Sequence, residues 1–151
     1  MPNTPVTIPS SVLKEIAEEL DLGMICHYHK STGEIVAIPK DYEDSGLEDE
    51  FWEADMEKVE QNAADYILFE PPTSTEAYKI MEGFIVSIAN ANTQQQFEEA
   101  IHRKKPFQQF NDLIFNYPDL REQWFAYKLQ RFIQYVQRIL EAYNSQFEDD
   151  V

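Results

Sequence analysis

Two histidines separated by one residue are the first candidates for chemistry in this sequence. His27 and His29 lie in a run of β-forming residues, and alternate residues of a strand point to one face, as metal-binding histidine pairs often do. Zinc would need a third ligand, for which Glu34 or an acidic segment is available. The alternative is a solvated strand face, because the sequence offers no partner that would orient the imidazoles. We therefore expect no metal and no other cofactor.

A thiol nucleophile is the second chemistry to consider, because Cys26 is the sole cysteine. A catalytic thiol needs a base beside it, but strand alternation points Cys26 away from His27 and His29. Carboxylates are abundant, yet no spacing singles out a glycosidase or protease pair, and nucleotide-, zinc- and calcium-binding motifs are absent. We expect a protein without catalytic activity; the alternative is a metal-dependent or hydrolytic enzyme that uses the two histidines and acidic residues.

Arginine and aromatic residues share one face of the last predicted helix. At 100° per residue this face comprises Leu120, Trp124, Tyr127, Arg131, Tyr135 and Arg138, with Lys128 at its border. Arginine among aromatic rings can bind an acidic protein or single-stranded nucleic acid through cation–π and stacking contacts. The alternative is that the face packs on the preceding helix and pairs its arginines with the chain's own carboxylates.

Asp112 adds an acidic group to these candidates. It falls on the polar side of the preceding helix, near a basic run that contains Arg103, Lys104 and Lys105. An ion pair or a hydrogen bond to a neighbouring helix is the alternative role for this carboxylate. The full set of residues that we expect to bind a partner is Trp124, Tyr127, Arg131, Tyr135, Arg138, Asp112, Arg103 and Lys104.

A helical hairpin must position these residues. Pro106 suits the first turn of a helix, and the apolar residues that follow it recur at three- and four-residue spacing. Pro118 disfavours helical geometry at the residue before it and can open the next helix. On that second helix we expect a core stripe of Phe125, Leu129, Phe132, Val136, Ile139 and Tyr143.

The rest of the chain alternates helix and strand signals. In chain order we expect a helix through Leu20 that Ser10 or Ser11 caps, a hairpin within residues 23–39 that turns near Gly33, and a helix from about Leu47. A strand over residues 66–72, a helix over residues 73–88 capped by Thr73, and a short helix opened by Thr93 should follow. The fold class is therefore α+β: a small antiparallel sheet, made of the hairpin and a third strand, packs with a helical C-terminal half that ends in a helical hairpin.

Length and composition predict one folded domain. We expect a flexible N-terminal arm over residues 1–9, a single α+β domain over residues 10–144 and an acidic tail over residues 145–151. The sequence has no secretory leader and no apolar run that could span a bilayer, so no membrane contact is expected. A lone cysteine is consistent with a reducing cytoplasm, which is the expected location.

Charge narrows the choice of partner. The net charge is −16, but residues 101–144 hold seven basic and four acidic residues. The rest of the chain therefore carries all of the excess negative charge. This balance argues against duplex DNA and anionic membranes, and it favours a basic protein. Residues 41–60 hold ten acidic residues and one lysine; they could form a docking element for a basic partner or a solvated helix face.

The ordered combination of three stretches resembles a bacterial family known as uncharacterised protein family 0158. These stretches are STGEIVAIP in the hairpin, EAYKIMEGFI, and the closing KPFQQFNDLI and YPDLREQWFAYKLQR. Family members typically carry F-R-R-F-K-D before a tryptophan, which Phe107, Phe110, Asp112 and Trp124 match, whereas Gln108, Gln109 and Asn111 replace the basic residues. The resemblance covers roughly residues 22–143, and it implies a fold and a bacterial cytoplasmic origin but no established activity.

These observations together predict an interaction module. We expect the C-terminal aromatic and arginine hairpin to bind a protein partner, with nucleic acid disfavoured by the acidic charge. The sequence leaves the partner and the oligomeric state open.

Overall fold

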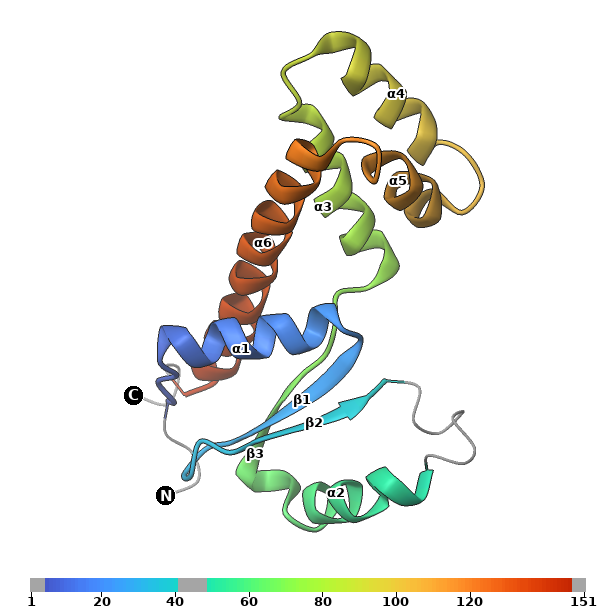
Figure 1. Ribbon diagram of the computed structural model, residues 1–151. Coiled ribbons are helices and arrows are strands. Elements are labelled where there is room, and N and C mark those ends of the chain that lie inside the picture. The colour runs from blue at the N-terminus through green and yellow to red at the C-terminus, as the bar shows by residue number, and fades with distance from the viewer. Residues whose placement is uncertain (1–4, 41–48, 148–151) are drawn as a thin grey trace. The chain divides into compact units, whose positions relative to one another are not determined.

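The computed structural model describes residues 5–40 and 49–147, and it confirms the predicted α+β class. The elements run in the predicted order, with one additional 3₁₀ turn before the third strand (Figure 1). They are α1 (Ser10–Asp21), β1 (Met24–His29), β2 (Ile35–Pro39), α2 (Asp49–Gln61), η3 (Ala63–Asp65), β3 (Tyr66–Phe69), α3 (Ser74–Val86), α4 (Ala91–Ile101), α5 (Pro106–Ile114) and α6 (Pro118–Ser145).

The chain divides into two compact units. The first unit comprises Met1–Pro71 and Phe132–Val151, and the second comprises Pro72–Arg131. The division falls inside the region predicted as a single domain, residues 10–144, and α6 contributes to both units. None of the described helices has the length and apolar character that crossing a membrane requires.

A three-stranded antiparallel sheet forms the centre of the first unit. The strand order is β2-β1-β3, with His27 opposite Val36 on one side and opposite Leu68 on the other. The hairpin turn contains Gly33, whose φ of 77° is a left-handed conformation that glycine adopts without a steric cost. The predicted hairpin and third strand are therefore confirmed.

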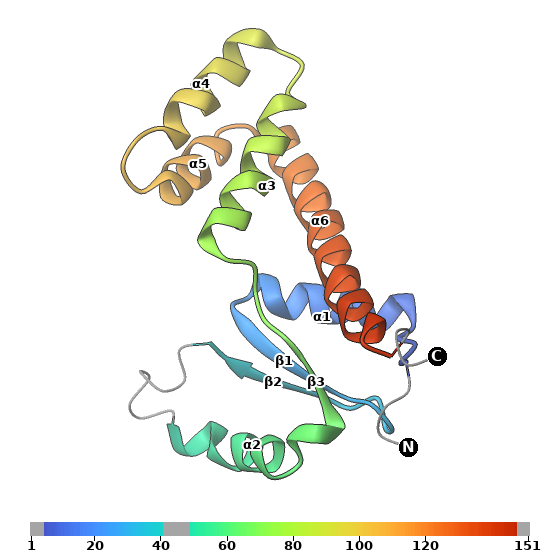
Figure 2. The same cartoon turned by 180° about the vertical axis from the view of Figure 1, so that it is seen from behind.

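Helices cover both faces of this sheet (Figures 1 and 2). On one face, Trp52, Met56 and Val59 of α2 pack against a cluster that includes Val36 and Ile38 of β2. On the other face, α1 packs against β1 and buries Leu13, Ile16, Ala17 and Leu20.

The described part of the N-terminal arm is bound to the end of α6. The backbone N–H of Val6 donates to Asn144 Oδ1, and Asn144 Nδ2 donates to the Val6 carbonyl, both at 2.8 Å. The buried side chain of Ile8 follows this pair. The prediction that Ser10 or Ser11 caps α1 is wrong, because the cap position is Pro9, which makes no side-chain cap hydrogen bond. In the predicted acidic tail, Phe147 contacts Tyr143, and residues 148–151 lie outside the described residues.

The second unit is helical and has an aromatic core. Thr73 caps α3 as predicted, with its hydroxyl accepting the Glu76 N–H. The prediction that Thr93 opens α4 is wrong by about one turn, because the Asn90 side chain caps this helix and accepts the Thr93 N–H at 3.0 Å. The largest buried aromatic side chains of this unit are those of Phe84, Phe97, Phe110 and Trp124.

The predicted core stripe of α6 is wrong at its N-terminal end. Phe125 is 47% exposed, whereas its neighbour Trp124 is 7% exposed and packs against Phe110 of α5, with ring centroids 4.8 Å apart. The buried face is thus rotated toward α5 at this end of the helix. Further along α6, the burial of Phe132 and Val136 agrees with the prediction.

Candidate functional site

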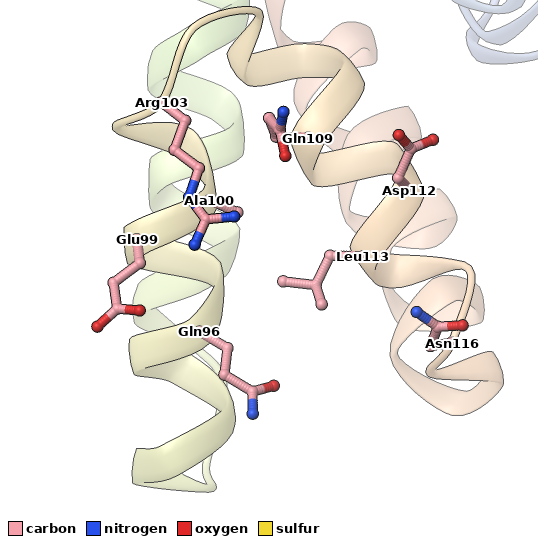
Figure 3. Close-up of a pocket in the computed structure, with 8 residues that line it drawn as sticks. All are labelled: Gln96, Glu99, Ala100, Arg103, Gln109, Asp112, Leu113 and Asn116. Atoms are coloured by element: carbon pink, nitrogen blue, oxygen red, sulfur yellow. The ribbon is translucent and has the colours of Figure 1, made fainter.

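A polar groove between α4 and α5 is the candidate functional site of the second unit. Lys105 joins these helices in a left-handed conformation, with φ 57°, and Pro106 occupies the first turn of α5, where its missing N–H is no loss. This tight connection brings the two helices side by side, and the groove has a volume of about 430 Å³ (Figure 3). Its lining residues are Gln96, Glu99, Ala100, Arg103, Gln109, Asp112, Leu113 and Asn116.

The lining combines a small apolar surface with amide and charged groups. Ala100 is buried in α4, and Leu113 extends from α5 toward it (Figure 3). Gln96, Gln109 and Asn116 add three side-chain amides, each of which can both donate and accept hydrogen bonds. Tyr117 donates its hydroxyl to Gln96 Oε1 at 2.6 Å, which fixes one of these amides. Such a lining can hydrogen-bond to peptide groups.

Two charged residues of opposite sign, Arg103 and Asp112, line this groove as well. Both were predicted from the sequence to bind a partner, and both are exposed. The side chain of neither residue makes a hydrogen bond or an ion pair with any residue that the structure describes. The alternative role of Asp112, an ion pair or a hydrogen bond to a neighbouring helix, therefore finds no support within residues 5–40 and 49–147.

Lys104 is exposed but does not line the groove. It is adjacent to Arg103 and carries the same charge, so the two residues form a natural pair for comparison. In the sequence both belong to one basic run. Only the packing of α4 against α5 distinguishes Arg103, which lines the groove, from Lys104, which does not.

The aromatic residues predicted on the arginine–aromatic face pack within the second unit. Trp124 lies against Phe110 and Phe84, and Tyr127 lies 5.6 Å from Phe84 between ring centroids. Gly83 of α3 allows this approach, because a Cβ atom at that position would overlap the Tyr127 hydroxyl. For Trp124, packing on the helix that begins at Pro106 is thus confirmed as the better interpretation.

The arginines of this face remain on the surface. Arg131 is exposed, with its guanidinium 6.0 Å from the centroid of the Tyr127 ring, and Arg138 is exposed on the part of α6 that belongs to the first unit. Neither arginine forms an ion pair with a carboxylate among the described residues. Tyr135, also in the first unit, donates its hydroxyl to the Pro71 carbonyl at 3.4 Å.

Sequence analysis did not single out the amides of the groove or the exposed aromatics of the second unit. Gln96, Gln109 and Asn116 have no distinguishing local pattern, since glutamine and asparagine are common on solvated helices. Phe115 was left unassigned and Phe125 was assigned to the core, yet they are 69% and 47% exposed. Helical periodicity on α6 could not have shown that Phe125 is exposed, because the packing of α5 decides which face of α6 is buried.

The two histidines share one face of β1, as predicted. His29 makes hydrogen bonds and a ring contact within the fold, and His27 is partly buried. His29 Nδ1 accepts the backbone N–H groups of Ser31 and Thr32, at 3.2 and 3.1 Å, and its ring meets Tyr66 edge-on. Burial is the main effect on His27, and it lowers the pKa of this imidazole from 6.5, against a smaller raising effect of Glu70. No group of three or more metal-ligating side chains occurs among the described residues.

Cys26 is fully buried in β1, on the sheet face that α1 covers. Burial, together with smaller contributions from the carboxylates of Glu19 and Glu15, raises the pKa of this thiol to about 12. A thiol with this pKa remains protonated near neutral pH, whereas catalytic cysteines have lowered values. The geometry gives Cys26 a packing role.

Comparison with known proteins identifies the family. The chain matches Uncharacterised protein family (UPF0158) over residues 3–150. It belongs to this family. The UPF0158 protein PA5073 of Pseudomonas aeruginosa is 25% identical over 138 residues, a span of 91% of this chain and 83% of that relative. No solved structure matches the chain. Membership confirms the resemblance seen in the sequence, and because UPF0158 is uncharacterised, the function must be argued from the geometry.

Proposed function

We propose that this UPF0158 protein is a non-catalytic interaction module that binds a peptide segment of a partner protein in the α4–α5 groove. The observation that carries this proposal is the pair of groove residues Arg103 and Asp112, whose side chains have opposite charges and no hydrogen-bond or ion-pair partner among the described residues. A bound segment would supply the missing partners.

The lining specifies the chemistry of that segment. Arg103 can bind a carboxylate through two parallel hydrogen bonds, and Asp112 can accept from a lysine or an arginine. The amides of Gln109 and Asn116 can pair with peptide N–H and C=O groups, and the surface at Leu113 can take a small apolar side chain. We therefore expect a segment that carries one acidic and one basic residue beside an apolar residue.

The charge of the second unit favours protein over nucleic acid. Residues 72–131 contain seven basic and seven acidic residues, so the unit has no net charge, and the excess of −16 lies in the first unit. In the groove itself, a phosphate backbone would meet Glu99 and Asp112 together with Arg103. Nucleic-acid binding without sequence preference depends on a continuous basic surface, which this lining does not provide.

Selection from a random peptide library displayed on phage tests the proposal. The immobilised full chain should enrich peptides with an acidic, a basic and an apolar residue, and the synthetic peptides should bind in solution. Arg103→Glu should weaken their binding by at least about tenfold, since the carboxylate then meets a like charge.

Lys104→Glu is the matched control, because it makes the same change of charge at the neighbouring residue outside the groove. It should leave the affinity within about twofold of the original value. Replacing the acidic residue of the peptide by lysine should restore binding to the Arg103→Glu variant. Equal losses for the two variants, or a library that enriches no sequence, would contradict the proposal.

A further inference from the structure

A second surface of the same unit combines exposed aromatic rings with cations at the junction of α5 and α6. Phe115 ends α5 and is 69% exposed, and Phe125 of α6 is 47% exposed. The guanidinium of Arg121 lies over both rings, 5.6 Å from the Phe115 centroid and 5.1 Å from the Phe125 centroid. Lys128 Nζ lies 5.5 Å from the centroids of Phe125 and Trp124. We refer to Phe115, Arg121, Phe125 and Lys128 as the cation–aromatic surface.

Helix stability does not explain the position of Arg121. It lies in the first turn of α6, where the helix dipole is positive and a cation is unfavourable. Its side chain makes no ion pair or hydrogen bond with a residue of the described ranges. Arg121 is exposed, so its guanidinium N–H groups are accessible to a ligand.

A carboxylate is the group that fits this arrangement. It can accept two parallel hydrogen bonds from a guanidinium, and it would also be stabilised by the positive end of the α6 dipole. The exposed faces of Phe115 and Phe125 offer an apolar contact directly beside that position. Lys128 adds a second positive charge, with its Nζ 5.5 Å from the centroid of the Phe125 ring.

We propose that the cation–aromatic surface binds an acidic segment of a partner protein, in which a carboxylate lies next to an aromatic or aliphatic side chain. Charge complementarity is the argument for this occupant, together with the apolar area on both sides of Arg121. The proposal is independent of the α4–α5 groove, since the two surfaces share no residue.

An acidic protein segment fits this surface better than single-stranded nucleic acid does. The surface holds two cations, Arg121 and Lys128, and Asp119 and Glu122 nearby in α6 offset their charge, so a chain of phosphates would not meet a continuous basic surface. A single carboxylate side chain can contact Arg121 alone. Nucleic acid nevertheless supplies stacking groups, and it is therefore an arm of the test.

Fluorescence anisotropy with defined probes tests this proposal on the full chain. The probe is a capped, fluorescein-labelled octapeptide with four acidic residues, one phenylalanine, one leucine and two glycines. We expect saturable binding that Arg121→Glu weakens by at least about tenfold, and that Arg121→Lys also weakens because lysine lacks the planar fork. Circular dichroism and urea unfolding should show that both variants are folded.

Arg131→Glu is the matched control. Arg131 is exposed, lies on the same helix within the same unit and is also near an aromatic ring, but it is outside the cation–aromatic surface. It should change the affinity by less than about twofold. Arg103→Glu should leave this probe bound, because the probe has no basic residue for Asp112 and its four carboxylates would meet Glu99 and Asp112 in the groove. Failure of the groove and failure of this surface can therefore be distinguished.

Three further probes set the outcomes that would overturn the proposal. Replacing the phenylalanine and leucine by alanine, or the acidic residues by lysine, should abolish most of the binding. Unchanged binding of the alanine peptide would show that the peptide is attracted by charge alone. Equal losses of affinity for Arg121→Glu and Arg131→Glu would show that the peptide does not bind at the cation–aromatic surface. A twelve-nucleotide oligothymidylate that binds more tightly than the acidic peptide would instead assign the surface to nucleic acid.

Discussion

Gly83 determines how closely α3 and α6 can approach within the second unit. A Cβ atom at this position would overlap the Tyr127 hydroxyl oxygen, although it would lie at an ordinary 3.6 Å from the Tyr127 Cζ atom. We expect Gly83→Ala to lower the free energy of unfolding by about 1–3 kcal/mol, because the tyrosine must move in a packed aromatic core. Urea unfolding monitored by circular dichroism measures this loss.

The Tyr127→Phe background provides the control for that prediction. Without the hydroxyl the overlap is removed, and alanine is favoured over glycine inside a helix by roughly 0.5–1 kcal/mol. Gly83→Ala should therefore be neutral or stabilising in this background. A loss as large as that in the original protein would show that another contact restricts Gly83.

His27 links the stability of the first unit to pH. Burial lowers the pKa of its imidazole below 6.5, so the unfolded chain binds a proton at a pH where the folded chain does not. The stabilising contribution is complete above 6.5 and is lost as the pH falls from there through the lowered pKa of the folded state. We expect the difference in unfolding free energy between the original protein and His27→Gln to be larger at about pH 7.5 than at about pH 5.5.

Glu70 gives this prediction an internal check. Its carboxylate raises the pKa of His27 against the effect of burial, so Glu70→Gln should move the titration of the imidazole to lower pH. Proton NMR of the His27 ring measures the midpoint directly. A midpoint that stays in place or rises in Glu70→Gln would contradict the assignment of these two opposing effects.

At the scale of the element, α6 offers a direct test of which face is buried. Trp124 is 7% exposed and Phe125 is 47% exposed, although they are neighbours in the chain. Trp124→Ala should lower the free energy of unfolding by about 3–5 kcal/mol, as expected for a large aromatic removed from a core. Phe125→Ala should cost less than about 1 kcal/mol, because much of its surface is already in water.

Equal losses of unfolding free energy for Trp124→Ala and Phe125→Ala would show that Phe125 is part of the core, as the sequence predicted. Phe110→Ala serves as a reference, since this side chain is 1% exposed in α5 and contacts Trp124. Its loss of unfolding free energy should be similar to that of Trp124→Ala. All three variants can be compared in a single series of urea titrations.

The elements with strong local signals were predicted correctly. Gly33 in a tight turn, Thr73 three residues before Glu76 and Pro106 in a first turn each satisfy backbone geometry or hydrogen bonding on their own. The start of α4 was misplaced because Asn90 and Thr93 both have side chains that can cap a helix. The sequence alone does not say which of the two residues is the cap.

The candidate site was predicted only in part. Asp112 and Arg103 were singled out from charge and spacing, and the structure places both in one groove. The groove itself depends on the left-handed Lys105, which reverses the chain, and a lysine gives no signal for that conformation. The same limit applies to Trp124 and Phe125, because the position of α5 decides which of them is buried.

At the scale of the whole molecule, charge is divided between the two units. The first unit holds the entire excess of −16, and the second, which contains both proposed binding surfaces, is neutral. The acidic unit contributes to solubility and repels other acidic molecules over distances of about 10 Å at moderate salt. Specific binding must therefore come from local groups, such as Arg103, Asp112 and Arg121.

NMR of the isotope-labelled full chain, titrated with a peptide selected on it, shows whether the α4–α5 groove binds a peptide segment. We predict that the side-chain amide signals of Gln96, Gln109 and Asn116 and the backbone amide of Arg103 shift with one common affinity. Signals of residues in β1 should stay in place. Binding that shifts signals elsewhere and leaves those four unchanged would contradict the account.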